Sequence, residues 1–131
     1  MAKSNQALDC PCGTGKKFEQ CCGVYLSGQE LAPNALALMR SRYTAYVMED
    51  QAYLQKTWHA STRPAVQLDQ QESCKWLGLT IVAQQQDAQH GTVEFIAKYK
   101  VNGRAQRLHE KSNFVLEDGA WLYVDGVFPD Q

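Results

Sequence analysis

The sequence lacks the features that mark several large classes of protein. Among its 131 residues, no apolar run approaches the roughly 20 residues that cross a bilayer, and no apolar segment precedes the first cysteine. The formal net charge is −1 and no basic block stands out, which argues against a nucleic-acid partner. Phosphate loops, dinucleotide fingerprints and serine-nucleophile elbows are also missing. We therefore expect a cytoplasmic protein that does not contact membranes and uses none of these catalytic motifs.

The most distinctive stretch that is present holds four of the five cysteines within thirteen residues, CPCGTGKKFEQCC. A Cys-x-Cys pair and a Cys-Cys pair flank an eight-residue loop. Clustered cysteines in a reducing compartment bind metal more often than they form disulfides, and neighbouring cysteines rarely reach disulfide geometry. A disulfide framework or redox-active thiols are the alternative, and Cys74 is interpreted as a separate buried thiol. We predict a closed tetrahedral Zn²⁺ site with four ligands: Cys10, Cys12, Cys21 and Cys22.

This stretch resembles the SEC-C motif, a zinc module that is also found at the C-terminal end of the SecA translocase. Thr14 occupies the position where that motif usually has serine. In SecA the related module contacts the chaperone SecB, so the resemblance implies that this loop docks a protein partner. Four thiolates leave no open coordination position, so we expect no chemistry at the metal. The residues that match the motif are Cys10, Cys12, Gly13, Gly15, Lys16, Phe18, Cys21 and Cys22.

The first half of the remaining chain has a helical pattern. After a linker with glycine and serine, apolar residues recur at three- and four-residue steps over 35–49, which predicts an amphipathic helix capped by Asn34. A second short helix is expected over 51–57, capped by Asp50. A third short helix is predicted over 70–76, ended by Gly78. The apolar stripe of the first helix consists of Leu36, Met39, Tyr43, Tyr46 and Val47.

The second half of the chain changes to a period of two. Residues 79–83 are rich in strand formers, and residues 92–101 alternate between apolar and polar side chains. Asn102-Gly103 and Asp118-Gly119 are strong signals for two-residue hairpin turns. Helices followed by an antiparallel meander of about four strands define an α+β domain.

The two hairpin turns also predict the strand register, and the register decides which side chains share a face of the sheet. Glu110, Ser112 and Asp125 fall on an otherwise apolar and aromatic face, where carboxylates need a compensating charge. Arg40, Arg42, Arg63 or His59 would supply that charge. On the opposite face, Glu94 is expected to pair with Lys111. The apolar members of the shared face are Val93, Phe95, Ala97, Tyr99, Leu108, Phe114, Leu116, Trp121 and Tyr123.

Three interpretations of this polar group remain open. It is a structural network that closes the end of the sheet, or it lines a ligand pocket in which Glu110 or Asp125 acts as a general acid or base. In the third, the register is wrong, because one β-bulge would turn a strand over. His59 is a further candidate for a catalytic base, although a lone histidine is more often a structural hydrogen-bonding group.

Four segments after the SEC-C motif, LMRSRYTAYV, YLQKTWHASTRP, HEKSNF and GAWLYVDG, resemble the bacterial YchJ family in order and spacing. The resemblance implies a zinc motif over residues 1–26 and a nuclear transport factor 2-like domain over 27–131. That α+β fold is a cystatin-like cone of N-terminal helices packed on a curved antiparallel sheet.

The resemblance supplies no catalytic residue set, because one fold hosts many functions. We therefore expect a bacterial zinc-binding protein that acts as a protein-interaction module rather than an enzyme. The alternative is a small-molecule enzyme or binding protein that uses the pocket of Glu110, Ser112 and Asp125.

Overall fold

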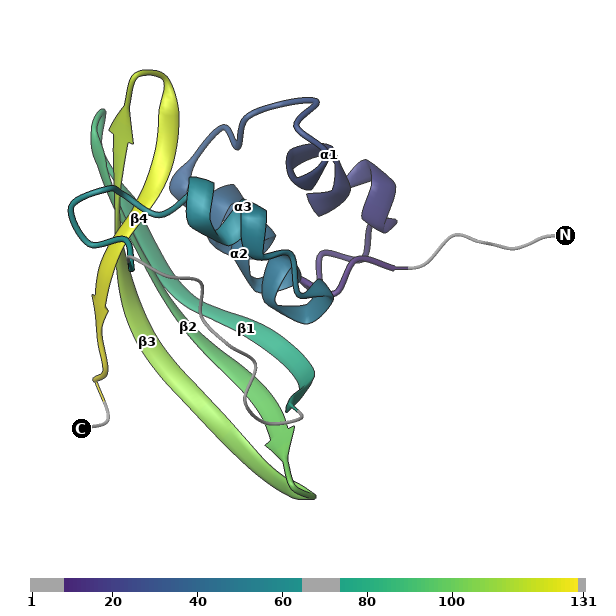
Figure 1. Ribbon diagram of the computed structural model, residues 1–131. Helices are drawn as coiled ribbons and strands as arrows, with labels where there is room; N and C mark the ends of the chain where they lie inside the picture. The colour runs from purple at the N-terminus through teal and green to yellow at the C-terminus, as the bar shows by residue number, and fades with distance from the viewer. Residues whose placement is uncertain (1–8, 65–73, 130–131) are drawn as a thin grey trace, which may run out of the picture.

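The computed structural model describes residues 9–64 and 74–129, and within these ranges short helices precede a curved antiparallel sheet (Figure 1). The four strands follow one another in the sheet in the order β1-β2-β3-β4. This meander confirms the predicted α+β class. No helix in the described ranges has both the length and the apolar character needed to cross a membrane. The elements are the 3₁₀ helix η2 (Phe18–Gln20), α1 (Cys22–Leu26), α2 (Ala35–Met48), α3 (Gln51–Lys56), β1 (Cys74–Gln86), β2 (His90–Val101), β3 (Arg104–Glu117) and β4 (Ala120–Val127).

Both predicted helix starts are confirmed by side-chain caps. The Asn34 side chain accepts a hydrogen bond from the Ala37 amide at 2.7 Å, which satisfies an amide at the start of α2 that has no partner within the helix. Asp50 does the same for α3, accepting from the Tyr53 amide at 3.0 Å. Between the two helices Glu49 has a left-handed backbone with φ of 59°, which ends α2 and turns the chain directly into α3.

Helix α2 is buried on more sides than an amphipathic stripe predicts. Leu36, Tyr46 and Val47 of the predicted stripe are only partly buried, whereas Ser41 and Thr44 are fully buried. The helix contacts α1, α3 and three of the four strands. Small side chains on its far side let these neighbours approach closely, so α2 forms the centre of the helical layer.

The predicted third helix is wrong over its described part, because Cys74–Trp76 begin the strand β1. The rest of that prediction, residues 70–73, lies outside the described residues. Trp76 pairs with Tyr99 of β2, and pairing of this kind overrides a weak local helix preference. Gly78 lies at a register shift within the strand instead of ending a helix.

The register of the β2–β3 hairpin is confirmed throughout, from Val101 opposite Arg104 to Phe95 opposite Glu110. The β3–β4 hairpin is confirmed near its turn, where Phe114 faces Tyr123. Beyond that pair a bulge between Asn113 and Phe114 shifts the register by one residue.

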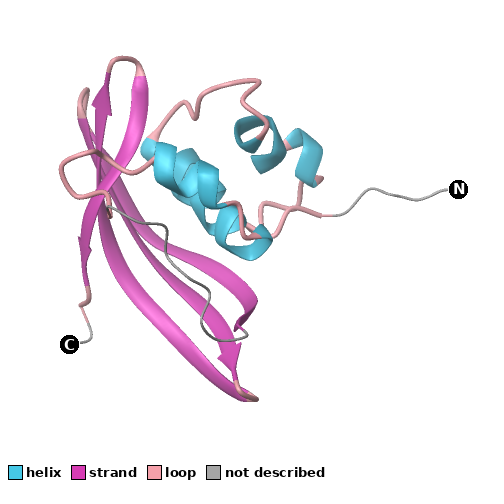
Figure 2. Cartoon of the chain, in the orientation of Figure 1, coloured by secondary structure: helices cyan, strands magenta, loops and turns pink. Residues whose placement is uncertain are grey.

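The helices all lie on one side of the sheet, and we call the sheet face that they cover the inner face (Figure 2). The β2–β3 hairpin extends beyond the helices, so that they cover only part of this face (Figure 1). The main core lies between the helices and the inner face. Its buried members include Leu38 and Met39 of α2 together with Val93, Phe95 and Phe114 of the sheet.

Candidate metal centre and cone cavity

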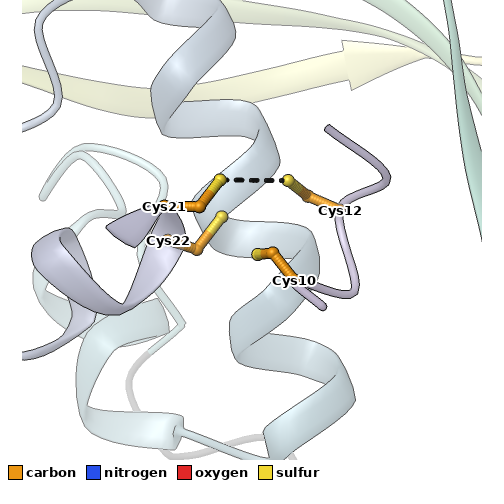
Figure 3. A group of neighbouring side chains, drawn as sticks. All are labelled: Cys10, Cys12, Cys21 and Cys22. Atoms are coloured by element: carbon orange, nitrogen blue, oxygen red, sulfur yellow. Dashed lines mark hydrogen bonds between the residues drawn. The ribbon is translucent and has the colours of Figure 1, made fainter. Parts of the chain in front are cut away.

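Four cysteine side chains converge between the N-terminal loop and the start of α1 (Figure 3). The sulfur atoms of Cys10, Cys12, Cys21 and Cys22 all lie within 4.8 Å of one another. The Sγ atoms of Cys12 and Cys21 lie 3.6 Å apart. Tetrahedral Zn²⁺ with bonds of about 2.3 Å to sulfur requires sulfur–sulfur distances of roughly 3.8 Å. The group therefore has the size and the donor atoms to hold a metal ion.

The loop backbone brings the two cysteine pairs together. Asp9 and Lys17 form an antiparallel bridge, and the Cys10 amide donates to the Lys16 carbonyl at 2.9 Å. Gly13 and Gly15 take φ angles of 86° and 88°, which side chains with a Cβ rarely adopt. These two glycines reverse the chain so that Cys10 and Cys12 face the second pair.

The cysteine loop is packed against α2. Cys10, Cys12 and Cys22 are buried and belong to the same core as the sheet and α2. Arg40 of α2 donates from Nη1 to the Cys12 carbonyl at 2.7 Å, and the Cys10 sulfur lies 3.7 Å from the Thr44 hydroxyl. The predicted boundary between residues 26 and 27 stays a prediction, since the loop and the cone share this core.

Without a metal, the thiols compete for protons. The hydrogen bond with the Cys22 thiol, joined by hydrogen bonds to Thr14 and opposed by burial, lowers the pKa of Cys12 to about 4. The same Cys12–Cys22 bond raises the pKa of Cys22, and burial raises the pKa of Cys21. Cys12 thus forms a thiolate easily, while Cys21 and Cys22 hold their protons. A bound cation would replace those protons, so the donor set fits a metal.

Cys74 is separate from this cluster, as the sequence predicted. It lies at the start of β1 opposite Val101 and is partly buried. Burial raises the pKa of its thiol. Among the described residues, the group that could hold a metal ion therefore consists of the four N-terminal cysteines.

A second feature is a cavity of about 240 Å³ between α2 and the inner face of the sheet. Its wall is mostly aromatic and aliphatic, with three of its polar side chains, Arg42, Glu110 and Ser112, themselves buried. The lining residues are Met39, Arg42, Tyr43, Tyr46, Trp76, Phe95, Ala97, Leu108, Glu110, Ser112, Phe114 and Tyr123.

Glu110 is the acidic side chain of this cavity, and it is only 8% exposed. Its Oε2 atom accepts hydrogen bonds from the Ser112 hydroxyl at 2.8 Å and the Tyr123 hydroxyl at 3.0 Å. Burial raises the pKa of Tyr123, and the charge of Glu110 raises it further. The predicted pairing of Phe95 with Glu110 is what places this carboxylate on the inner face.

Arg42 is the cationic side chain of the cavity, and it is 5% exposed. Its Nη1 atom donates to the Leu54 carbonyl at 2.9 Å and the Thr57 hydroxyl at 2.7 Å, both in α3 or its cap. The guanidinium carbon lies 5.2 Å from the ring centre of Trp58 and 4.7 Å from that of Tyr123. Of the four predicted cations, Arg42 is therefore the one that lines the cavity with Glu110, whereas Arg40 binds the cysteine loop.

The remaining candidates lie elsewhere. The β3–β4 bulge places Gly126, not Asp125, opposite Ser112, so the prediction that Asp125 shares the cavity is wrong. Asp125 is exposed and accepts from the Asn113 side chain at 2.8 Å.

His59 is not among the residues that line the cavity. Its ring nitrogens contact Glu117 and Ser61, each at 2.8 Å. Arg63 donates to the Trp58 carbonyl at 3.0 Å.

On the outer face, Glu94 contacts a neighbouring histidine instead of the predicted partner Lys111. Glu94 and Lys111 are opposite in the register, but the Glu94 carboxylate contacts Nε2 of His109 at 2.7 Å. The sequence also did not identify Trp76 as a cavity residue, because its helical pattern placed it outside the sheet. The signal that could have placed Trp76 in β1 was the alternation of apolar and polar residues around Tyr99, its partner in β2.

Comparison with known proteins identifies both the cysteine loop and the domain that follows it. The SEC-C motif matches residues 9–23, and the family described as "YchJ, middle NTF2-like domain" matches residues 34–126. A UPF0225 protein of Cupriavidus pinatubonensis is 54% identical over 124 residues, covering 89% of this chain and 86% of that protein. One from Chromobacterium violaceum is 47% identical over 133 residues, covering 96% and 97%.

Solved structures show the same arrangement of the chain. The solution structure of a SEC-C motif containing protein from Rhodopseudomonas palustris has a TM-score of 0.83 at 33% identity and covers 92% of this chain and 98% of that one. The crystal structure of a SEC-C motif containing protein from Psychrobacter arcticus has a TM-score of 0.73 at 28% identity, with coverage of 88% and 80%. With its cysteine cluster, its NTF2-like cone and these relatives, the chain belongs to the YchJ family of UPF0225 proteins.

Proposed function

We propose that this protein binds a small molecule in the cone cavity, and that a structural Zn²⁺ holds its cysteine loop. The observation that carries the proposal is the cavity itself. It has a volume of about 240 Å³, an aromatic wall, and buried groups of both charges, Arg42 and Glu110. Concave and mostly apolar sites with a few convergent polar groups are the usual form of ligand pockets.

A purely structural polar network explains these features less well. Such a network accounts for the bonds from Ser112 and Tyr123 to Glu110. It does not account for the space beside them, which equals the volume of about eight water molecules. The cavity is partly open to solvent, and other clefts of the described residues reach similar volumes, but this one combines an aromatic wall with buried groups of both charges. We therefore regard the cavity as space kept for a ligand.

Zinc is the metal that suits the cysteine cluster best. Four thiolates in a tetrahedral arrangement select zinc or iron, and a closed site with four protein ligands is typical of structural zinc. Free thiols of this kind are kept reduced in the cytoplasm, where we place the protein. Metal analysis of the purified protein should give one zinc per chain, and Cys22→Ser should lower that content.

Ligand binding can be tested by NMR titration of the zinc-loaded protein with a library of single-ring metabolites. We expect shifts of the Glu110 and Ser112 amide resonances. Leu108→Trp should abolish these shifts by filling the cavity, whereas Ala105→Trp on the outer face of the same strand should not. If no compound shifts these resonances, or if Leu108→Trp binds as well as the native chain, the cavity is not a binding site.

An acid–base enzyme, such as an isomerase or dehydratase, is a narrower form of this proposal. It is supported by the position of the Glu110 carboxylate at the cavity wall. Such an enzyme should lose turnover of a bound compound in Glu110→Gln while it retains zinc. Unchanged turnover in that variant would rule out Glu110 as the acid or base.

Protein docking through the cysteine loop is a second candidate. It is supported by the exposure of residues 13–17, which lie on the outside of the loop while three of its four cysteines are buried. Removing zinc or changing Lys16→Glu should then remove partners from a pull-down, whereas Lys56→Glu on α3 should not. An unchanged set of partners after chelation would rule out zinc-dependent protein docking through the cysteine loop.

A further inference from the structure

The guanidinium of Arg42 has only one edge left for a ligand. Both hydrogens of Nη1 are used by the Leu54 carbonyl and the Thr57 hydroxyl. Its faces lie against the rings of Trp58 and Tyr123. Among the described residues, the hydrogen bonds of Arg42 all come from Nη1, and neither Nε nor Nη2 has an acceptor. Neither nitrogen is fully shielded from solvent, and Arg42 lines the cavity. Nε and Nη2 together form the flat edge that binds a carboxylate with two parallel hydrogen bonds.

Arg42 also lacks a counter-ion in direct contact. Arginine cannot lose its proton in a protein, so a buried guanidinium keeps its positive charge. No carboxylate of the described residues forms an ion pair with Arg42. The nearest balancing charge in the cavity is that of Glu110, and Tyr123 stands between them. A buried charge without a partner is costly, and a bound anion would remove this cost.

Glu110 provides the opposite charge in the cavity. The hydrogen bonds from Ser112 and Tyr123 both end on Oε2. No other described side chain donates to Oε1, and an ionised carboxylate can only accept. A ligand group that donates a hydrogen bond, such as an ammonium or hydroxyl group, therefore suits this end.

The rest of the cavity wall is apolar and aromatic. Trp76 lies edge-on to Tyr43, with ring centres 5.6 Å apart, and its ring centre is 5.4 Å from that of Tyr99. Phe95 and Leu108 continue the wall. These walls favour an aromatic or branched aliphatic body, and the volume limits it to about one ring.

We propose that the ligand is a small apolar acid that carries both a carboxylate and a hydrogen-bond donor, as in an apolar amino acid or hydroxy acid. The carboxylate binds Nε and Nη2 of Arg42, and the donor binds Glu110. A simple amine would leave Arg42 without a partner, and a dianion would be repelled by Glu110. This inference rests on the proposed function, because it requires that the cavity bind a small molecule.

Matched ligands test the carboxylate on the native protein, so that no variant has to fold. The probes are 3-phenylpropanoate and its neutral amide, 3-phenylpropanamide, with binding followed by NMR at Glu110 and Ser112. We expect the carboxylate to bind tighter by about tenfold to a hundredfold, the range for hydrogen bonds to a charged group. Equal affinities would overturn the role of Arg42 while leaving the cavity a binding site. Failure of both probes and of neutral indole to bind would instead count against the proposed function.

Two further comparisons test the donor and the residues. L-Phenylalanine adds an ammonium group to 3-phenylpropanoate and should bind several-fold tighter, an advantage that Glu110→Gln should remove. Arg42→Gln should remove the preference for 3-phenylpropanoate over its amide. If Glu110→Gln keeps the full preference for L-phenylalanine, the assignment of the donor end is wrong. Arg63→Gln, outside the cavity lining, is the matched control and should change neither preference.

Discussion

Gly126 is the residue whose lack of a side chain matters most for the cavity. It lies opposite Ser112, and a Cβ atom at this position would lie 2.7 Å from Cδ of Glu110 and closer still to Oε2. We predict that Gly126→Ala displaces Glu110 from Ser112 and Tyr123 and lowers the free energy of unfolding by about 1–3 kcal/mol. Urea denaturation of the zinc-loaded protein measures this loss.

Gly78→Ala is the matched control for that substitution. Gly78 also lies within a strand, but a Cβ atom there meets nothing within 4 Å. The change should be neutral, or stabilising by up to about 1 kcal/mol, because alanine loses less backbone freedom on folding. Equal destabilisation by both substitutions would mean that the effect comes from the strands in general and not from the contact with Glu110.

The roles of Arg40 and Arg42 are not separable from the sequence alone. Helical periodicity places the two arginines on opposite flanks of α2 at similar angles from its apolar stripe. It cannot decide which is buried, because both flanks of this helix are covered. The cysteine loop binds Arg40 on one side, and α3 with Trp58 encloses Arg42 on the other. Only the positions of these neighbours, which are tertiary information, separate the two roles.

Among the elements, the cysteine loop should depend on its metal. We predict that chelation of the metal, or Cys22→Ser, lowers the melting temperature and exposes the α2 side chains that pack against Cys10, Cys12 and Cys22. Structural zinc supplies much of the folding free energy of small zinc modules, about 10 kcal/mol or more in peptides. Differential scanning calorimetry with and without chelator measures the shift.

Cys74→Ser supplies the control for the loss of a cysteine. Cys74 is a partly buried thiol of β1 that lies outside the cluster, so its replacement should leave the zinc content at one per chain. The melting temperature of Cys74→Ser should still fall on chelation. If Cys22→Ser retained full zinc content, the four-cysteine site would be disproved.

At the level of elements, the sheet shows which parts of the strand register sequence patterns can predict. Asn102-Gly103 and Asp118-Gly119 encode hairpin turns through local backbone preferences, so the register next to each turn was predictable. The bulge between Asn113 and Phe114 has no such local signal, and it alone moved Asp125 from the inner to the outer face. The sequence pattern missed the start of β1, because Trp76 joins the sheet by pairing with Tyr99, a contact between strands that local preferences do not encode. Glu110 was therefore predictable as a site residue, whereas the second carboxylate was not.

At the scale of the whole molecule, buried tyrosines should set the alkaline limit of stability. Burial raises the pKa of Tyr43, Tyr53 and Tyr123 above the usual value near 10. Above pH 10 the unfolded chain loses these protons while the folded chain keeps them, so the folded state binds more protons and its stability falls as the pH rises. Each tyrosine contributes up to about 1.4 kcal/mol per pH unit, and nothing below pH 10.

Urea denaturation of the zinc-loaded protein between about pH 9 and pH 11 measures this slope. Tyr123→Phe should make the slope shallower, since one of the groups no longer titrates. A free energy of unfolding that stays constant to pH 11 would contradict the prediction, and so would an unchanged slope in Tyr123→Phe.

The outer face of the sheet is locally basic, although the chain as a whole is nearly neutral. Residues 96–109 contain four lysine or arginine residues and no acidic residue, although the whole chain has a formal charge of −1. Three of the four, Lys98, Lys100 and Arg107, lie on the outer face. Exposed Lys75 lies opposite Lys100, and like charges in direct cross-strand contact destabilise a sheet. The sequence alone could not bring Lys75 to this position, because it depends on the pairing of β1 with β2.

The same substitution at two lysines of this face should therefore have opposite effects. Lys100→Glu converts the pair with Lys75 to opposite charges and should raise the free energy of unfolding by roughly 0.5–1 kcal/mol. Lys111→Glu places a second carboxylate opposite Glu94 and should lower it by a similar amount. Because exposed charges are screened by salt, both effects should shrink when urea denaturation is repeated at about 1 M ionic strength. Effects of the same sign, or effects insensitive to salt, would show that the paired charges do not govern the stability of this face.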